Sequence, residues 1–358
     1  MKLALVHDWL ISPVGGAENT LKEIHALFPG PVHTLVCNHG PFPYEIKTSF
    51  IQYIPKSLFR LFLPLFPRAI QQFNFSDYDL ILSSSHCVAK GARTHKNQLH
   101  ICYCHTPMRY AWDLRDEYLR NANLTSGLKG WLTCKILKYI RKWDYNTSNR
   151  VDHFIANSHF IAARIKKNYG RDATVIYPPV DTSYYFLETQ KANYYITSSR
   201  LVAYKKIDLI AEAFAQMPDL KLIIIGDGPE AAKIKRAPNI EFLGYVPNEI
   251  LRKYLQKAKA FLFAAIEDFG ILPIEAMACG TPVIALNKGG TAETILNEQT
   301  GLLFEEQTTS DIQKAVRKFE TMQFDPTTIS KHASRFSKER FRSEYKQFVD
   351  AKIKEKRL

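Results

Sequence analysis

Short apolar runs that end in polar or small residues alternate with amphipathic helical patterns along this 358-residue chain. In the first half, these runs are residues 3–9, 31–38, 78–85, 100–106 and 152–158. Alternation of this kind is typical of βαβ units and a parallel sheet. Ligands bind such sheets beyond the carboxyl ends of the strands. The pattern therefore predicts an α/β fold in which residues 83–86, His105 and residues 157–159 share one functional edge.

A proline pair marks the expected domain boundary. Pro178 and Pro179 cannot continue a strand or a helix interior, and a second series of alternating strands and helices follows them. A chain of this length, with 46% hydrophobic residues, suits two cores better than one. The sequence predicts one domain over residues 1–179 and a second over 180–335. A basic helix over about 336–358 is expected to pack back on the first.

The segment from residue 267 to residue 290, EDFGILPIEAMACGTPVIALNKGG, is the most informative in the chain. Glu267 is expected to end a strand, and Glu275 lies eight residues later, near the start of a helix. A carboxylate can accept hydrogen bonds from two neighbouring sugar hydroxyls, and the free N–H groups of a helix start suit a phosphate. Acids in a first helical turn are also favoured by the helix dipole. That alternative explains Glu275 alone, but it does not explain Glu267.

Two cations flank a loop at the start of the second domain. Arg200 ends a predicted strand, and Lys205 follows five residues later. Two fixed cations can neutralise a departing diphosphate without a metal ion. The alternative is that they are ordinary surface cations, and for Lys206 we favour that alternative.

These segments together carry a resemblance to a known family. GGAE, R-x4-K, GDGPE, E-x7-E, CGTPVIA and GG-x2-E occur in this order. The set resembles the family 4 retaining glycosyltransferases over nearly the whole chain. The resemblance implies the α/β GT-B fold, in which two Rossmann-like, doubly wound domains face a central cleft. In the first half, VHDWL, SSS-H-x2-KG, CYCHTPMRYAWD and FIANS resemble the bacterial mannosyltransferase branch that acts in O-antigen and exopolysaccharide assembly. That branch generally uses GDP-mannose.

The resemblance also implies roles for individual residues. Arg200 and Lys205 would grip the donor diphosphate, and Glu275 would hold the ribose hydroxyls. Glu267 would hold the transferred sugar, and His105 would lie over that sugar near the reacting carbon. The other implied donor-binding residues are Gly15, Gly16, Gly226, Val246, Phe269, Gly270, Ile271 and Leu272, and the acceptor side would include His86, Arg109 and Glu18.

The expected mechanism follows from the residue types. A double displacement needs a carboxylate nucleophile, and no carboxylate of the first domain presents itself, because His105 occupies the corresponding position. We therefore expect same-face substitution, with no metal and no cofactor. Asp77 and Asp79 form a DxD, which binds a metal in other glycosyltransferases. Here the motif leads straight into an apolar run, so we favour a role in capping the strand entry.

The net charge of +13 suggests an anionic partner. Residues 118–143 contain no acid, and residues 54–70 combine Phe and Leu with three cations. Two basic amphipathic stretches are typical of a membrane-surface contact, with Trp131, Lys135, Lys138 and Trp143 as the contact residues. Alternatively, both stretches pack on the domain. No apolar run reaches membrane-spanning length, and the first residues do not form a signal peptide. We expect a cytoplasmic protein that can be peripheral on the membrane.

Competing functions remain open. The expected partners are a nucleotide-sugar donor, a saccharide or lipid-linked acceptor and an anionic membrane surface. A UDP-hexose-dependent transferase, an epimerase or a phosphorylase could use the same fold. A basic nucleic-acid-binding protein is the alternative from another class, but it would leave the R-x4-K and E-x7-E patterns unexplained.

Overall fold

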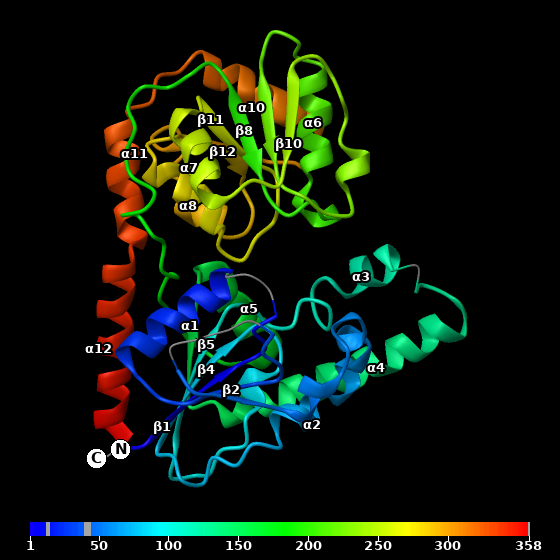
Figure 1. Cartoon of the computed structure of the whole chain (residues 1–358), viewed down its shortest axis with the longest axis vertical. Helices are drawn as coiled ribbons and strands as arrows, with labels where there is room; N and C mark the ends of the chain where they lie inside the picture. The colour runs from blue at the N-terminus through cyan, green and yellow to red at the C-terminus, as the bar shows by residue number, and fades with distance from the viewer. Residues whose placement is uncertain (12–14, 39–43, 123, 357–358) are drawn as a thin grey trace. The chain divides into compact units, whose positions relative to one another are not determined.

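A computed structural model describes residues 1–11, 15–38, 44–122 and 124–356. The chain divides into two compact units (Figure 1). Unit 1 contains Met1–Pro178 and Phe341–Leu358, and unit 2 contains Pro179–Arg340. The division lies one residue before the boundary expected from the proline pair. Each unit has its own sheet and its own core, as an α/β chain of this length requires.

The sheet of unit 1 has seven parallel strands in the order β3-β2-β1-β4-β5-β6-β7. Their bounds are β1 Leu3–His7, β2 Val32–Thr34, β3 Ile46–Thr48, β4 Leu80–Ser85, β5 Leu99–Cys104, β6 His153–Ala156 and β7 Ala173–Val175. In the register, His7 lies beside Ser84, and Ser85 lies beside Cys104. The carboxyl ends of β1, β4 and β5 are therefore level, so the residues that follow them share one edge.

Both faces of this sheet are covered, as expected for a doubly wound fold. On β1, Leu5 belongs to one apolar cluster, whereas Ala4 and Val6 belong to another. The helices of unit 1 are α1 Gly16–Leu27, α2 Phe66–Ile70, α3 Arg115–Asn121, α4 Gly127–Thr147, α5 His159–Tyr169 and the greater part of α12 Lys338–Lys356. The last buries Phe341, Tyr345 and Val349 in the cluster that contains Leu5.

The sheet of unit 2 has six parallel strands in the order β10-β9-β8-β11-β12-β13. Their bounds are β8 Tyr195–Ser198, β9 Leu222–Ile225, β10 Ile240–Gly244, β11 Ala260–Phe263, β12 Val283–Leu286 and β13 Gly301–Phe304. The helices are α6 Ile207–Ala215, α7 Asn248–Lys257, α8 Ile271–Ala278, α9 Thr291–Thr294, α10 Thr309–Glu320 and α11 Pro326–Ala333. The strand order reverses between β8 and β11, which is where doubly wound sheets bind ligands.

Three strands and one boundary differ from the expectations. Strands β3, β7 and β13 have three or four residues each and were not predicted. Glu267 does not end a strand, because β11 stops at Phe263 and Glu267 follows four residues later. It lies in a loop that forms an isolated parallel bridge to Gly289. The loop, and not the strand, therefore sets the position of the carboxylate.

Candidate functional site

A lysine and a glutamate meet at the carboxyl edge of the unit 2 sheet. Lys205 follows β8 in a short 3₁₀ turn, and Glu267 follows β11, the strand paired with β8. The Nζ of Lys205 lies 2.7 Å from Oε1 of Glu267, and the side chains are 18% and 16% exposed. The ring of Phe263 lies 5.7 Å from the same Nζ. Partial burial strengthens this ion pair, yet both groups can still reach a ligand.

The two glycines after β12 hold the Glu267 loop. The N–H of Gly290 donates to the carbonyl oxygen of Glu267 at 2.8 Å. A Cβ at Gly289 would lie 2.4 Å from that oxygen, and a Cβ at Gly290 would lie 2.3 Å from Cα of Phe269. No side chain fits at either position without displacing the loop. Backbone packing against the Glu267 loop therefore explains the two glycines of the GG-x2-E pattern.

Helix α8 begins directly after this loop. Gly270 adopts φ +88°, a conformation that favours glycine, and turns the chain so that Ile271 and Leu272 form the first turn. Glu275 follows one turn into the helix and is half-buried. The pKa of Glu275 is raised to about 7, because burial and, to a smaller degree, the nearby Asp181 outweigh the lowering effect of a hydrogen bond with Tyr185. The carboxyl group therefore gains or loses its proton near neutral pH.

The GDG turn after β9 packs against the loop that carries Arg200. Gly226 has φ +137°, and a Cβ there would lie 1.8 Å from the carbonyl oxygen of Ser199. The N–H of Gly226 donates to Gly244 at the end of β10, so the loop that contains half-buried Val246 lies beside the same turn. Arg200 itself is exposed. Unit 2 thus gathers the loops of the predicted donor residues at one edge of its sheet.

In unit 1, His105 follows β5 and is held by two neighbouring strands. Its Nε2 lies 2.8 Å from the hydroxyl of Ser84, and the side-chain amide of Asn157 donates to its carbonyl oxygen at 3.0 Å. His7 approaches the same Ser84 hydroxyl at 3.2 Å. Burial, followed by the neighbouring His86 and His7, lowers the pKa of His105 well below the usual value. His105 is therefore neutral near pH 7, and its ring takes part in hydrogen bonds without carrying a charge.

The role of Asp8 is structural. Its Oδ2 accepts from the N–H groups of His86 and Cys87 at 2.6 and 2.9 Å, and its Oδ1 accepts from Val88 and Ala89 at 2.6 and 2.7 Å. The residue is fully buried. Nδ1 of His86 lies 3.3 Å from Oδ2, and the exposed part of this histidine is 23%. Asp8 therefore positions the turn that places His86 next to His105, with their ring centroids 6.3 Å apart.

The start of α1 carries the remaining predicted residues of this unit. The carboxylate of Glu18 accepts the N–H of Gly15 at 3.0 Å, and a Cβ at Gly15 would lie 2.8 Å from that oxygen. Glu18 thus stabilises the glycine turn and the first turn of α1, which begins at Gly16. Arg109 is half-buried in the segment that follows His105.

The DxD lies at the opposite end of the strands. Asp79 immediately precedes β4, and its Oδ2 accepts the backbone N–H of Lys2 at 2.7 Å. It belongs to the amino ends of the strands, whereas His7, Ser84 and His105 belong to the carboxyl ends. Asp79 therefore secures the strand entry.

Two family models match almost consecutive parts of the chain. The model described as "Glycosyltransferase Family 4" matches residues 14–184, and the model described as "Glycosyl transferases group 1" matches residues 186–340. The chain belongs to glycosyltransferase family 4. The two matches divide close to the boundary between unit 1 and unit 2, so each half of the family pattern corresponds to one sheet.

Curated relatives align over part of this family 4 chain. An uncharacterized glycosyltransferase of Methanocaldococcus jannaschii is 27% identical over 54% of the chain and 56% of its own length. A GDP-mannose-dependent monoacylated alpha-(1-6)-phosphatidylinositol monomannoside mannosyltransferase of Corynebacterium glutamicum is 34% identical over 30% of the chain and 32% of its length. The chain therefore spans about half or less of the length of these relatives.

Solved structures match the family 4 chain over its whole length. HepE of Anabaena, crystallised with UDP, has a TM-score of 0.69 at 19% identity and covers 98% of this chain and 100% of its own. Sucrose-phosphate synthase of Thermosynechococcus elongatus has a TM-score of 0.73 at 18% identity, with 99% of both chains covered. The fold is GT-B, with two Rossmann-like α/β domains.

The residues predicted for membrane contact lie on different sides of α4. An α-helix turns about 100° per residue, so Trp131 and Trp143 are separated by about 120°. Trp131 is 59% exposed. Trp143 is half-buried, and its ring lies 2.3 Å from where a Cβ of Gly91 would be. Trp143 therefore packs on the domain, which corrects its expected place beside Trp131. No described helix is long and apolar enough to span a bilayer.

Sequence reasoning missed several residues that build the site. Ser84 was only part of a polar run, and Tyr185, which hydrogen-bonds with Glu275, lay in the expected linker. A buried ion pair between Lys90 and Asp144, with Nζ and Oδ1 2.5 Å apart, was also missed. An Asp within a basic helix was a signal that could have been used. Asp144 follows 26 residues without an acid, so an internal partner could have been suspected.

Proposed function

We propose that the protein is a retaining glycosyltransferase that moves mannose from GDP-mannose to a lipid-linked or saccharide acceptor. The observation that carries the proposal is the pair formed by Lys205 and Glu267 beside the start of α8. A diphosphate needs a cation, and sugar hydroxyls need a fixed acceptor. Lys205 supplies the cation and Glu267 supplies the acceptor, and the two charged groups lie 2.7 Å apart. A structural ion pair would have no need to lie at the ligand-binding edge of the sheet.

In the proposed reaction, Lys205 and Arg200 stabilise the charge that develops on the leaving diphosphate. Glu267 and the backbone N–H groups at the start of α8 hold the sugar, and Glu275 accepts from the ribose hydroxyls. The bond from the anomeric carbon to the diphosphate oxygen breaks, and the acceptor oxygen forms a bond on the same face. The acceptor proton goes to the departing phosphate oxygen. His105 is neutral near pH 7, so in this reaction it forms a hydrogen bond with the sugar and does not act as an acid.

Two observations support GDP-mannose as the donor, one from a relative and one from the sequence motifs. One relative at 34% identity is named as GDP-mannose-dependent, and the motifs of the first half resemble the mannosyltransferase branch. HepE binds UDP, which keeps a UDP-hexose as the second candidate donor. Acceptors in bacterial surface polysaccharide synthesis fit the same resemblance.

A thermal-shift panel with GDP, UDP, ADP and CMP, without metal, tests the donor. A nucleotide at about 100 times its dissociation constant adds about 2.7 kcal/mol and raises the melting midpoint by a few degrees. A selective shift with GDP supports GDP-mannose as donor. A selective shift with UDP replaces it by a UDP-hexose. The absence of any shift, with and without Mn²⁺, would contradict the site.

The role of Lys205 has a matched control in the same unit. Lys221 pairs with Glu241 at the same distance of 2.7 Å, but on the surface, where the two side chains are 53% and 44% exposed. We expect Lys205→Met to lower the turnover of sugar transfer by about 10² to 10³, in the range of lost transition-state donors. Lys221→Met should leave turnover unchanged. Equal turnover in the two variants would remove Lys205 from the mechanism.

We also propose that unit 1 contacts an anionic membrane surface. Leu58, Leu61, Leu128 and Trp131 are exposed apolar residues in or next to the basic stretches. Flotation with vesicles that contain anionic lipid tests this contact, because the negative surface potential of such vesicles attracts basic segments. Retention that vanishes with neutral vesicles supports it, and no retention contradicts it.

Nucleic-acid binding is the alternative from another class. It predicts RNA affinity that falls steeply with salt, together with no response to any nucleoside diphosphate. The same thermal-shift panel, repeated with a short single-stranded RNA at two salt concentrations, separates the two functions.

A further inference from the structure

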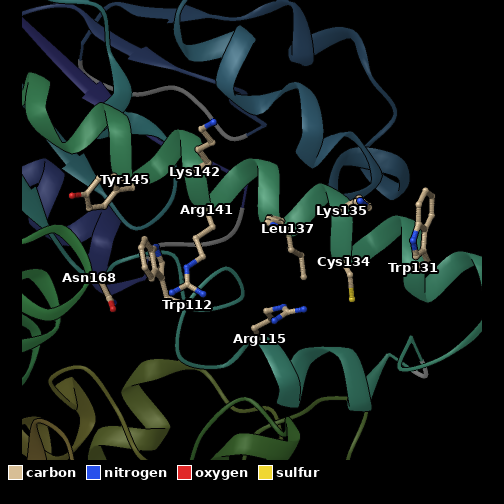
Figure 2. A pocket seen from close by; sticks show the side chains of 11 residues that line it. Trp112, Arg115, Trp131, Cys134, Lys135, Leu137, Arg141, Lys142, Tyr145 and Asn168 are labelled. Carbon is tan, nitrogen blue, oxygen red and sulfur yellow. The ribbon is translucent and has the colours of Figure 1, made fainter.

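A groove of about 730 Å³ lies between α4 and the segment that leads into α3, entirely within unit 1. In Figure 2, Arg141 and Leu137 extend from α4 toward Arg115 at the start of α3, and Trp112 lies beside Arg141. The volume is within the range of sites for small ligands. None of the residues so far assigned to the donor or to His105 lines this groove.

The lining of the groove is cationic and contains no carboxylate. Its charged members are Arg115, Lys135, Lys138, Arg141 and Lys142. No described acidic residue forms an ion pair with any of these five, whereas other cations of unit 1 do have carboxylate partners, such as Lys166 with Asp172 and Arg342 with Glu23. Five like charges around one cavity repel one another, and an anion inside it relieves that repulsion.

Trp112, which forms part of one wall of the groove, is held in place by a buried carboxylate. The Nε1–H of Trp112 donates to Oδ2 of Asp144 at 2.8 Å, and Oδ1 of Asp144 pairs with buried Lys90 at 2.5 Å. The guanidinium carbon of Arg141 lies 4.2 Å from the centre of the Trp112 ring. Stacking orients the planar guanidinium, which can then bind a phosphate with two parallel hydrogen bonds. The recognition group is thus held in place before any ligand arrives.

The rim of the groove is apolar on the side of the α4 start. Trp131 lines the groove and is 59% exposed, and Leu128 and Leu132 beside it are 80% and 52% exposed. A free phosphate would use only the cations and leave this surface in water. A ligand with a phosphate and a hydrocarbon chain would cover both parts.

We propose that this groove binds the phosphate-bearing head of a lipid-linked acceptor, with the first part of the lipid chain over Trp131 and Leu128. Arg115 and Arg141 bind the phosphate oxygens, and Lys138 adds charge at the same place. The acceptor role rests on the proposed function. The binding itself does not, because it requires neither a donor nor transfer.

The binding is measured with farnesyl diphosphate, a soluble lipid diphosphate, below its aggregation concentration. The Lys205→Met variant is used throughout, so that the proposed donor site does not compete for diphosphate. All four tryptophans belong to unit 1, and two of them line the groove, so tryptophan quenching reports occupancy. We expect saturable quenching, with at least tenfold weaker binding of inorganic diphosphate and of farnesol.

A matched pair of charge reversals separates the groove from a diffuse basic surface. Lys129 and Lys138 are nine residues apart on α4, which places them on opposite sides of the helix. Both are exposed, and Lys129 does not line the groove. We expect Lys138→Glu to weaken binding at least tenfold and Lys129→Glu less than twofold. Arg115→Glu, a change on α3, should match Lys138→Glu.

The contrary results are distinct. Equal weakening by Lys129→Glu and Lys138→Glu would overturn the groove in favour of a general basic surface. Inorganic diphosphate binding as tightly as farnesyl diphosphate would overturn the lipid part of the proposal. A nucleotide shift in the native protein together with no farnesyl diphosphate binding would overturn this inference and leave the proposed function intact.

Discussion

The carboxyl edges of the two sheets carry polar groups of opposite character. In unit 1, His7, Ser84 and His105 are almost completely buried and bonded to one another, without any net charge near pH 7. In unit 2, Lys205 and Glu267 form an ion pair that stays partly open to solvent. A neutral, prearranged edge suits hydrogen bonds to an uncharged sugar. A charged pair that can exchange one partner for a ligand suits a nucleotide diphosphate. Two similar folds thus offer different chemistry because the residues after their strands differ.

The largest expected effect concerns the buried pair of unit 1. Replacement Lys90→Met leaves the Asp144 carboxylate buried without its cation, and such losses cost about 3–5 kcal/mol of unfolding free energy. Urea unfolding followed by tryptophan fluorescence measures it, because all four tryptophans are in unit 1. The control is Lys166→Met, which breaks an exposed pair with Asp172 and should cost less than about 1 kcal/mol. Similar losses in both variants would mean that burial does not distinguish the two pairs.

Acid should destabilise unit 1 before unit 2. Burial lowers the pKa of His33 and His100 to about 4, and it also lowers the pKa of His7 and His105. Because the folded pKa lies below the unfolded value of 6.5, the stability is complete above pH 6.5 and is lost as the pH falls toward 4. For fully buried His100 the contribution is about 3 kcal/mol. Tryptophan fluorescence should therefore change at higher pH than the part of the far-ultraviolet circular dichroism that unit 2 contributes. Coincident transitions would contradict the contrast.

A glycine substitution tests how tightly the edge of unit 2 is packed. We expect Gly226→Ala to abolish the nucleotide-induced thermal shift, because its Cβ would lie 1.8 Å from the Ser199 oxygen and displace the Arg200 loop. Gly170→Ala is the control, since it also has positive φ but no atom within 4 Å. It should cost about 1 kcal/mol through backbone strain alone and leave the shift unchanged. A normal nucleotide response in Gly226→Ala would show that the turn is not part of the site.

The smallest expected effect is a proton released when nucleotide binds. Burial raises the pKa of Glu275 to about 7, so about half of the molecules hold a proton there at pH 7. Ribose hydroxyls that donate to the carboxylate favour its ionised form and lower this pKa. Calorimetric titration in two buffers of different ionisation enthalpy should show release of up to about 0.5 proton. Glu275→Gln should remove it, and the same release in that variant would assign the proton to another group.

The stability term from Glu275 has the opposite sign to that of the histidines. Its folded pKa lies above the unfolded value, so its contribution is complete at low pH and is lost as the pH rises through about 7. The histidines thus make unit 1 less stable as the pH falls, whereas the contribution of Glu275 to the stability of unit 2 decreases as the pH rises.

The sequence was most informative where local chemistry is repeated. Apolar runs followed by polar residues located the central strands and placed His105 and Ser84 at one edge, because parallel strands fix which end carries the loops. Strands β3 and β7 escaped prediction because their residues, IKT and ATV, mix polar and apolar side chains and are half-buried or exposed, so they form no apolar run. In β13 the apolar run is only three residues long. The sequence placed Glu267 at the end of a strand and a glycine pair after the next one, but the bridge between Glu267 and Gly289 depends on two segments that follow β11 and β12.

Long-range pairing accounts for most of what was missed. Nothing near Lys90 in the sequence indicates that its partner lies 54 residues later on α4. Without knowledge of that partner, the sequence of α4 predicts one basic amphipathic face that contains both Trp131 and Trp143. The buried Asp144 fixes the rotation of the helix, so Trp143 turns toward the core and Trp131 toward solvent. A periodic pattern gives the faces of a helix, but only the contacts decide which face is covered.

The turn after β4 has a further consequence for the difference between the units. Four successive N–H groups, from His86 to Ala89, converge on one point, and such a nest ordinarily attracts a phosphate. In this protein the carboxylate of Asp8 occupies that point, and Asp8 directly follows β1, the strand next to β4. Unit 1 therefore carries a permanent internal substitute for an anionic ligand. The four N–H groups of this turn are therefore not available to an anionic ligand, because Asp8 already accepts a hydrogen bond from each of them.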